Sequence, residues 1–490
     1  MAEKKKDNII YYEAFEELDN EWIDENSKNH CFKDGKGEIE LKKSVKKIGV
    51  HAFATCGELI SIVIPDSVTE IESDAFSDCC GMKKIVIGNS VKKIGSNAFE
   101  LCLSLKDLQI GGSVKKIEYE AFCECISLES VVIPDSVTEI GDGAFVECRR
   151  LKRLKIGSSV RKIGESAFDA CCALSSITVA EGNPKYDSRG NCNSIIETAS
   201  NKLILGSGNT VIPESVEEIG DSAFSCRRNL TSVDIPPAVK KIGSCAFHGC
   251  TGLVSLIIPD SVKEIEYGAF EDCKSLESIT IGKNLKKIGE NIFNNCFSLD
   301  RITVSQFNSV YDSRDGCNAV IKTAANTLVA GCKNTVIPDS VTKIGNNAFY
   351  GCSALTLMNI PPSVTEIGED AFCWCISLSS VKIPNSVEKI GEGAFGQCSS
   401  LMSVMIPVLV KDLSYRTFCG CWNLKSVVLP DSLEAIGGLA FCECRKLKFV
   451  MIPDSVKTIG EEAFKGCQEL SEETRERISA KIVLGSKIKN

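Results

Sequence analysis

Cysteine and histidine are the side chains of this sequence with the most obvious capacity for metal or redox chemistry. The chain contains 27 cysteines and three histidines, which are His30, His51 and His248. Thiol and imidazole lie close together in the segment Cys245-x-x-His248-x-Cys250. A zinc site there would need a fourth ligand and convergent geometry. Because His248 occupies a variable turn position of the repeat described below, we favour an ordinary solvent-facing histidine over a zinc ligand.

Pairs of the form Cys-x-Cys are a second candidate for metal or redox chemistry. They are Cys123/Cys125, Cys373/Cys375, Cys419/Cys421 and Cys442/Cys444. The second cysteine of each pair belongs to a regular series and the first simply follows a phenylalanine, so a structural origin is the simpler explanation. The chain has no G-x-S-x-G, H-E-x-x-H or P-loop sequence, each of which would indicate a reaction class. We predict no enzyme, no catalytic residue, no metal and no cofactor.

Phenylalanine, usually preceded by a small residue, recurs at a strict interval. It occupies positions Phe53, Phe76, Phe99, Phe122, Phe145, Phe168, Phe224, Phe247, Phe270, Phe293, Phe349, Phe372, Phe395, Phe418, Phe441 and Phe464. Every interval is 23 residues except two of 56. A strict period in this range predicts a stacked solenoid, in which each repeat forms one coil and neighbouring coils bury each other's apolar faces.

Cysteine follows the phenylalanine by three positions in all but one of these repeats, from Cys56 to Cys467. The Phe224 repeat differs, with Arg227 at that position and Cys226 one place earlier. Equivalent positions of neighbouring coils would stack about 4.8 Å apart. That separation suits a disulfide, but the Cβ vectors would run parallel rather than toward each other. We favour a ladder of reduced, buried thiols over extensive disulfide bonding.

Each repeat carries a strand signal followed by a turn signal. In the repeat that ends at Phe76, Leu59, Ile62 and Ile64 form an L-x-x-I-x-I segment whose end alternates like a strand. Pro65 follows at once, and proline or glycine takes this place in other repeats. Either residue ends the strand, because proline lacks the donor for a ladder and glycine permits the bend. We expect the strands of successive coils to lie side by side.

The two intervals of 56 residues resemble each other. The sequence Tyr-Asp-Ser-Arg occurs at 186–189 and again at 311–314, and each copy is followed by a β-rich stretch, a polar break and a second apolar stretch. Strand, short polar turn and strand predict a β-hairpin. We therefore expect hairpin-bearing insertions at about 180–210 and 305–335 that keep the solenoid continuous.

The ends of the array must cover its first and last coils. Residues 1–36 are acidic and lack a regular pattern, so we expect an irregular N-terminal cap. The solenoid is expected to span residues 37–470. Ser471 precedes two glutamates, which is the pattern of a helix N-cap with acidic residues in the first turn. Residues 471–490 are therefore expected to form a short capping helix and a tail.

Composition and charge exclude some classes of partner. The formal net charge of −9 and the pI of about 5.3 disfavour a nucleic-acid binder driven by phosphate neutralisation. No apolar stretch approaches the roughly 18 residues of a membrane span. The start of the chain lacks the apolar region and cleavage site of a secretory leader. We expect no nucleic-acid partner and no membrane span, and cell-surface and cytoplasmic locations both stay open.

The repeat unit resembles that of a known family. The pattern C-x-x-L-x-x-V-x-I-P-D-S-V-x-x-I-G-x-x-A-F, as it stands from Cys125 to Phe145, resembles the BspA-like leucine-rich-repeat family of surface proteins. The match is specific, because proline, Ala-Phe and cysteine fall in phase many times. The resemblance implies a helix-poor, right-handed, curved leucine-rich-repeat solenoid with a parallel β-sheet on its concave side. It also implies adhesion or host interaction through extracellular-matrix or cell-surface proteins.

The exposed strand positions are where such a solenoid offers a binding surface. In the N-terminal third they form a basic stripe, broken by Glu129, of Lys83, Lys84, Lys106, Lys152, Arg153 and Lys155. In the C-terminal third they form a more apolar group of Met402, Met405, Phe449 and Met451. Exposed methionine and phenylalanine can mark a contact site, whereas drift of unconstrained repeat positions would produce the same pattern. If functional, the first group fits an acidic partner and the second an apolar one.

These observations favour a non-enzymatic protein-binding scaffold. Adhesion, or interaction with a host or cell-surface protein through the solenoid surface, is the favoured role by family resemblance. A structural, self-assembling repeat array and an intracellular adaptor are the alternatives. The expected partner is a protein, and the oligomeric state stays open.

Overall fold

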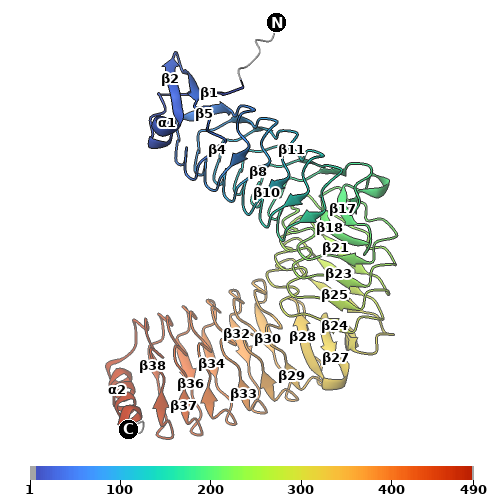
Figure 1. Cartoon of the computed structure of the whole chain (residues 1–490). Helices are drawn as coiled ribbons and strands as arrows, with labels where there is room; N and C mark the ends of the chain where they lie inside the picture. Colours follow the sequence, from blue (N-terminus) through green and yellow to red (C-terminus); the bar gives the residue numbers. More distant parts are fainter. Residues whose placement is uncertain (1–6, 488–490) are drawn as a thin grey trace. The chain divides into compact units, whose positions relative to one another are not determined.

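The structure is a computed structural model that describes residues 7–487 (Figure 1). The chain divides between Ala238 and Val239 into two compact units. In each unit, successive coils follow one another in chain order, and the strands of one coil pair in parallel with those of the next. The predicted helix-poor solenoid with parallel sheets is therefore confirmed.

The longer strand of most coils is the predicted L-x-x-I-x-I segment, although residues 230–235 form no strand. In the first unit these strands are β5 (Leu59–Val63), β7 (Lys84–Val86), β9 (Asp107–Gln109), β11 (Ser130–Val132), β13 (Arg153–Ile156) and β15 (Ser176–Val179). In the second unit they are β21 (Ser255–Ile258), β23 (Ser278–Ile281), β25 (Arg301–Val304), β30 (Leu357–Asn359), β32 (Ser380–Lys382), β34 (Ser403–Met405), β36 (Ser426–Val428) and β38 (Phe449–Val450). In β13, Leu154 is buried whereas Arg153 and Lys155 are exposed. This alternation leaves one solvent-facing row of side chains on each strand.

A second parallel ladder, which the sequence analysis missed, joins the coils through two-residue strands. In the first unit it comprises β4 (Lys47–Ile48), β6 (Glu70–Ile71), β8 (Lys93–Ile94), β10 (Lys116–Ile117), β12 (Glu139–Ile140), β14 (Lys162–Ile163) and β19 (Glu218–Ile219). In the second unit it comprises β20 (Lys241–Ile242), β22 (Glu264–Ile265), β24 (Lys287–Ile288), β29 (Lys343–Ile344), β31 (Glu366–Ile367), β33 (Lys389–Ile390), β35 (Asp412–Leu413), β37 (Ala435–Ile436) and β39 (Thr458–Ile459). Two residues are too few to show a period of two. Oppositely charged side chains of adjacent strands in this ladder also form ion pairs. Glu139 of β12, for example, contacts Lys116 of β10 at 3.0 Å and Lys162 of β14 at 2.9 Å.

Antiparallel hairpins form in both long intervals, as predicted. Their elements are β16 (Tyr186–Asp187), the 3-10 turn η1 (Arg189–Asn191), β17 (Ser194–Glu197) and β18 (Lys202–Gly206) in the first interval, and β26 (Tyr311–Asp312), η2 (Arg314–Gly316), β27 (Ala319–Lys322), η3 (Thr323–Ala325) and β28 (Thr327–Gly331) in the second. β17 pairs with β18 and β27 with β28. β18 then pairs in parallel with β19, and β28 with β29. The second strand of each hairpin therefore takes the place of a two-residue strand beside β19 or β29, whereas β14 and β24, which precede the insertions, are edge strands of separate sheets.

The N-terminal segment 1–36 is not irregular as predicted. Its described part forms β1 (Ile9–Ala14), α1 (Glu21–Asn26) and β2 (Ser27–Lys33), followed by β3 (Lys36–Leu41). β1 pairs antiparallel with β3 on one side and with β5 on the other, and its Ile10 and Tyr12 are buried. β1 could not be recognised from its own sequence pattern, because its stability comes from side-chain packing against strands that follow later in the chain.

The predicted C-terminal capping helix is confirmed and is longer than its sequence signal. α2 spans Glu472–Lys487. The Ser471 hydroxyl accepts a hydrogen bond from the backbone N–H of Thr474 at 3.3 Å, which is the contact that an N-cap makes. Ile478 is buried in the same cluster as the last coils. Residues 488–490 of the expected tail lie outside the described residues.

Stacked phenylalanine rings form the core beneath the turns. From Phe53 to Phe168 the rings of successive coils lie nearly parallel, with centroids 5.0 to 5.4 Å apart. The backbone N–H of Phe76 donates to the carbonyl of Ala98 in the next coil at 2.8 Å. Ala75 and Ala98 are fully buried where these neighbouring turns meet, which accounts for the small residue before most of the phenylalanines.

Candidate functional site

The six basic residues of the predicted stripe are all exposed, but they do not form one continuous group. Lys84 lies on β7 and Lys83 precedes it, whereas Arg153 and Lys155 lie on β13. β7 and β9 belong to one sheet, and β11 and β13 to another. The strands between the two groups carry Asp107, and Glu129 contacts Lys152 at 3.1 Å. The positive charge is therefore gathered at two places rather than along a stripe.

The first basic group lies beside a groove at the N-terminal cap. The groove has a volume of about 480 Å³ and is lined by residues of β1, β3, β5 and β7. Glu13 and Glu38 line it together with Lys83 and Lys84. Carboxylates and ammonium groups thus share this part of the surface. The sequence analysis missed the groove because it depends on the antiparallel pairing of β1.

The apolar candidates lie on the last long strands of the second unit. β34 pairs with β36 and β36 with β38, so that Met405 lies opposite Val428 and Ser426 opposite Phe449. Met405 and Met451 are each 64% exposed and Val428 is 54% exposed. Because their positions differ by the repeat length of 23 residues, Met405, Val428 and Met451 form one row, with Phe449 two residues before Met451. We call these four residues the apolar row.

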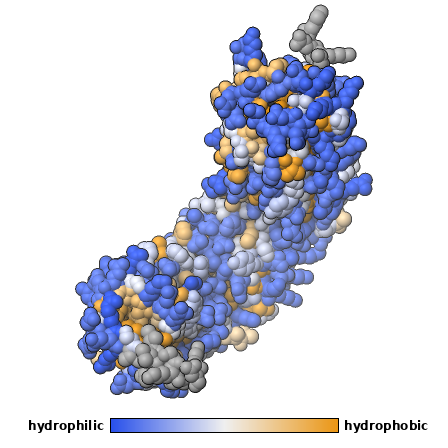
Figure 2. Space-filling model, turned by 60° about the vertical axis from the view of Figure 1, so that its left-hand side comes forward, coloured by the Kyte–Doolittle hydropathy of each residue, from blue (hydrophilic) through white to orange (hydrophobic). Residues whose placement is uncertain are grey.

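The apolar row contains a residue that the sequence analysis did not include, Val428. The signal that could have found it is the 23-residue spacing, which places Val428 midway between the two methionines. Met402 is also exposed but precedes β34, at a different position of the coil. Figure 2 shows one face of the molecule, on which hydrophilic residues dominate and hydrophobic ones gather in small areas. The apolar row differs from single exposed residues such as Val132 and Ile257 in that its members lie in three successive coils.

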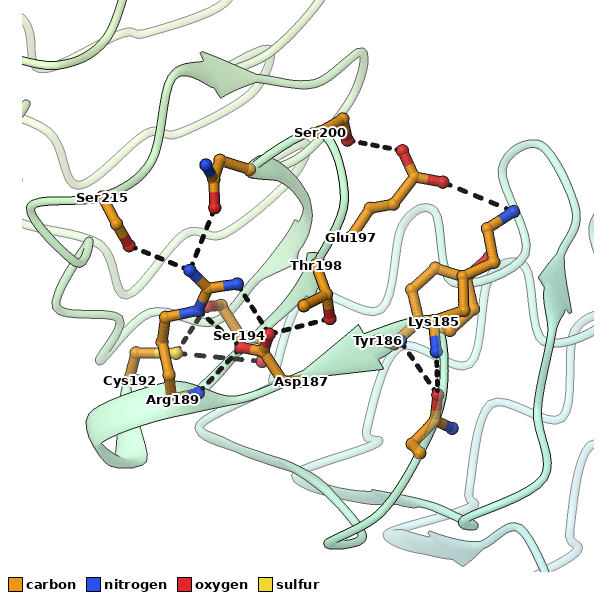
Figure 3. Close-up of polar contacts among 12 residues, drawn as sticks. Lys185, Tyr186, Asp187, Arg189, Cys192, Ser194, Glu197, Thr198, Ser200 and Ser215 are labelled. Carbon is orange, nitrogen blue, oxygen red and sulfur yellow. Dashed lines mark hydrogen bonds and ion pairs between the residues drawn. The ribbon is translucent and has the colours of Figure 1, made fainter.

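The Tyr-Asp-Ser-Arg motif of the insertions has a structural role (Figure 3). The Arg189 guanidinium donates to both carboxylate oxygens of Asp187, at 2.8 and 2.6 Å, and also to the side-chain oxygens of Asn201 and Ser215, each at 3.0 Å. The hydroxyl of Thr198 donates to Asp187 at 2.9 Å. The second insertion repeats these contacts around Arg314 and Asp312. The network joins the strands and the turn of each insertion and fixes the hairpins.

Arg227, which replaces a ladder cysteine, is fully buried next to the first insertion. Its guanidinium donates to the carbonyl oxygens of Gly206 at 2.8 Å, Cys171 at 3.1 Å and Ser225 at 2.7 Å. The contact with Cys171 joins residues 56 positions apart. The longer arginine side chain thus links the coil before the insertion, the hairpin and its own turn. The departure from the cysteine pattern is therefore structural.

Each insertion also leaves a cavity, and the two cavities are lined by equivalent residues. The first has a volume of about 340 Å³ and the second about 80 Å³. Ala167 lines the first, and the larger Ile292 occupies the equivalent place in the second. The larger Ile292 side chain fills part of the space that is open beside Ala167.

The ladder cysteines are buried, as predicted, except Cys56 and Cys352, which are partly exposed, and most of their thiols are hydrogen-bonded. Twelve of them donate to the carbonyl of the phenylalanine 26 residues earlier: Cys79, Cys102, Cys125, Cys148, Cys171, Cys273, Cys296, Cys375, Cys398, Cys421, Cys444 and Cys467. Burial raises the pKa of the Cys125 and Cys398 thiols well above the ordinary value. Since the thiolate is the reactive form, these side chains are poor nucleophiles.

The remaining sequence candidates do not come together as a catalytic site. His248 is half-buried rather than solvent-facing, and its Nδ1 lies 3.7 Å from a carboxylate oxygen of Glu271. The chain also contains Gly391-x-Gly393-x-x-Gly396, a spacing found in dinucleotide-binding loops. Here it follows the two-residue strand β33 and forms the phenylalanine turn rather than opening a helix. It therefore lacks the helix N-terminus that holds a pyrophosphate.

The coils, their two parallel ladders and the stacked turns define a leucine-rich-repeat solenoid. The chain belongs to the BspA type leucine rich repeat region family, which matches residues 25–145, 115–192, 206–314, 326–448 and 411–481. No curated protein matches the sequence. No helix among the described residues is long and apolar enough to cross a membrane.

Solved structures of bacterial repeat proteins resemble the chain. A leucine-rich repeat protein from Bacteroides ovatus is 28% identical, with 88% of this chain and 89% of that chain covered and a TM-score of 0.42. A leucine rich cell surface protein from Faecalibacterium prausnitzii is 24% identical, with 93% and 98% covered and a TM-score of 0.42. The pneumococcal vaccine antigen PcpA is 19% identical, with 75% and 99% covered and a TM-score of 0.43.

Proposed function

We propose that this protein is a non-enzymatic scaffold that binds a protein partner through the exposed face of β34, β36 and β38. The apolar row carries the proposal. Exposed apolar residues also occur at this strand position as Val132 in β11 and Ile257 in β21, but the next coil carries lysine or threonine there. In Met405, Val428 and Met451 exposed apolar side chains follow one another in three successive coils, and contact with a partner would bury them together.

The chemistry of the row favours an apolar partner surface. Methionine side chains are flexible and polarisable, so they adapt to an irregular partner. Exposed phenylalanine next to them adds an aromatic anchor of the kind enriched in interfaces. Parallel pairing holds neighbouring strands about 4.8 Å apart. The four side chains of the apolar row are therefore close enough to form one continuous contact surface.

We further propose adhesion or interaction with a host or cell-surface protein as the biological role. The support for this role is the membership of the chain in the BspA-type repeat family. The basic groups around Lys83 and Arg153 supply a second, polar contact that suits an acidic partner. The proposal includes no reaction, because the surface residues named here offer recognition and no paired acid and base.

A comparison of matched variants tests the apolar row. The triple variant Met405→Lys, Val428→Lys and Met451→Lys should lose most of the protein that wild type captures from a mixture of extracellular-matrix proteins. The control carries lysine at the same strand position of other coils, as Thr280→Lys, Thr303→Lys and Asn359→Lys, and should capture like wild type. Circular dichroism checks the fold of both. Equal capture by the triple variant and wild type would remove the apolar row from the function.

A further inference from the structure

Two carboxylates and one thiol converge on the phenylalanine turns of two neighbouring coils. Glu100 directly follows Phe99, and Cys123 directly follows Phe122 in the next coil. Glu120 lies three residues before Cys123. One carboxylate oxygen from each glutamate and the Sγ of Cys123 all lie within 4.8 Å of one another. This group lies on the turns and not on the strand face proposed above for a protein partner.

The thiol of Cys123 differs from the ladder thiols beside it. It is only 7% exposed, and within the described chain its sulfur makes no hydrogen bond. Cys125, two residues later, donates to the carbonyl of Phe99 at 3.3 Å. The buried Cys123 thiol therefore lies against two carboxylates instead of donating to a backbone carbonyl.

One of the two carboxylates is held in place by a neighbouring polar group. The side-chain amide of Asn97 donates to Glu100 at 2.9 Å. Outer partners of this kind orient metal ligands in known sites. Like charges at such short range repel each other. A cation placed among the three groups would remove that repulsion.

We propose that Glu100, Glu120 and Cys123 bind a thiophilic divalent cation of the Zn²⁺ type. Zinc accepts sulfur and carboxylate ligands together, and three protein ligands leave its fourth position to water. Calcium and magnesium prefer oxygen ligands alone, in larger number. On binding, the Cys123 thiol releases its proton to solvent and the sulfur becomes a thiolate ligand. The cation would tie two adjacent coils together at their turns.

The chain contains a matched site that should not bind. Asp370 and Cys373 occupy the same positions in the Phe372 coil as Glu120 and Cys123 do in the Phe122 coil. Cys373 is similarly buried, but the preceding coil offers Tyr350 where Glu100 stands. With one carboxylate instead of two, this site lacks the third ligand. Cys373 therefore serves as an internal control for binding to buried thiols in general.

Metal titration of the full chain under reducing conditions tests the proposal. Wild type should take up one equivalent of Co²⁺ with the absorption of a thiolate-to-metal charge transfer, and Zn²⁺ should displace it. Cys123→Ser should abolish the band, Glu100→Gln should weaken Zn²⁺ binding about tenfold or more, and Cys373→Ser should leave both unchanged. Cys31→Ser, which removes an exposed thiol, should also leave both unchanged.

Three results would overturn the proposal. These are an absence of stoichiometric uptake by wild type, unchanged uptake by Cys123→Ser, and equal losses in Cys123→Ser and Cys373→Ser. Circular dichroism establishes that each variant is folded. Should Cys123→Ser fail to fold, the Glu100→Gln and Glu120→Gln variants decide the question, because they keep the thiol and alter only the carboxylates.

Discussion

The Sγ of Cys102 lies 3.3 Å from the carbonyl oxygen of Phe76 in the preceding coil. The same contact recurs from coil to coil, so the cysteine series is a hydrogen-bonded ladder and not merely a set of small apolar side chains. A thiol can donate in this contact, whereas a thiolate cannot. The ladder therefore depends on the thiols keeping their protons.

Stability should fall at alkaline pH for this reason. Burial raises the pKa of Cys102 above its ordinary value, whereas the unfolded chain releases the thiol proton near pH 8.5. The unfolded state then binds fewer protons, so the free energy of unfolding decreases as pH rises above about 8.5 and is unaffected below it. Above about pH 8.5, each such thiol lowers the free energy of unfolding by about 1.4 kcal/mol per pH unit.

Urea unfolding of wild type and Cys102→Ala at pH 7, 8, 9 and 9.5 measures this effect. The advantage of wild type over the variant should be constant up to pH 8 and should then shrink by about 1.4 kcal/mol per unit. The comparison removes contributions from lysine and tyrosine, which both proteins share. A constant difference up to pH 9.5 would show that the Cys102 thiol titrates alike in both states.

Removing a stacked ring should destabilise the array strongly. Phe270 is fully buried, and its centroid lies 5.7 Å from that of Phe247 and 6.0 Å from that of Phe293. Phe270→Ala should cost about 3–5 kcal/mol in chemical unfolding, because a buried phenylalanine leaves a cavity when truncated. Phe307→Ala, at a side chain that is 74% exposed, should cost less than about 0.5 kcal/mol. A loss under 1 kcal/mol for Phe270→Ala would show that the Phe270 side chain does not pack in the core.

The buried guanidinium of Arg227 should be required for the first insertion. In Arg227→Met the carbonyls of Gly206, Cys171 and Ser225 lose their donor, and each buried unsatisfied carbonyl costs about 1–3 kcal/mol. Relief from burying a charge offsets part of this cost, so we expect a net loss of a few kcal/mol. Limited proteolysis should then cleave the insertion faster than in wild type. Arg228→Met, at an exposed neighbour, should behave as wild type. If both variants are cleaved at the same rate, the guanidinium of Arg227 does not stabilise the insertion.

Sequence periodicity predicted the coil and its long strand because these features depend on residues within one repeat. Leu154 and Ile156 face the core as their alternation indicates. The N-terminal cap was not predictable in the same way, since β1 is sandwiched between β3 and β5. One local signal was present, because Asp34 and Gly35 have φ values of 51° and 77°. Asp-Gly with two positive φ angles is a favoured hairpin turn, and it joins β2 to β3.

The candidate surfaces were predictable only in part, because contact between residues on different coils depends on register. The exposure of Met405 and Met451 followed from the strand pattern, but Val428 was overlooked without alignment of the repeats. Glu100 and Cys123 occupy the same repeat position in successive coils, and only the stacked turns show that they meet. The interruption of the basic stripe by Glu129 was recognised from the sequence, whereas that by Asp107 on β9 was not.

The basic group on β13 should determine affinity for acidic molecules without affecting the fold. Lys152 and Lys155 are exposed, and the contact of Lys152 with Glu129 is a surface ion pair, which contributes about 0–1 kcal/mol. The double variant Lys152→Glu and Lys155→Glu should therefore unfold like wild type yet elute from immobilised polyglutamate at lower salt, since such attraction between exposed charges is screened by ions. Lys382→Glu with Lys425→Glu makes the same change of charge at exposed positions of the second unit and should elute later than the first variant. If both variants elute together, net charge and not the β13 group governs the binding.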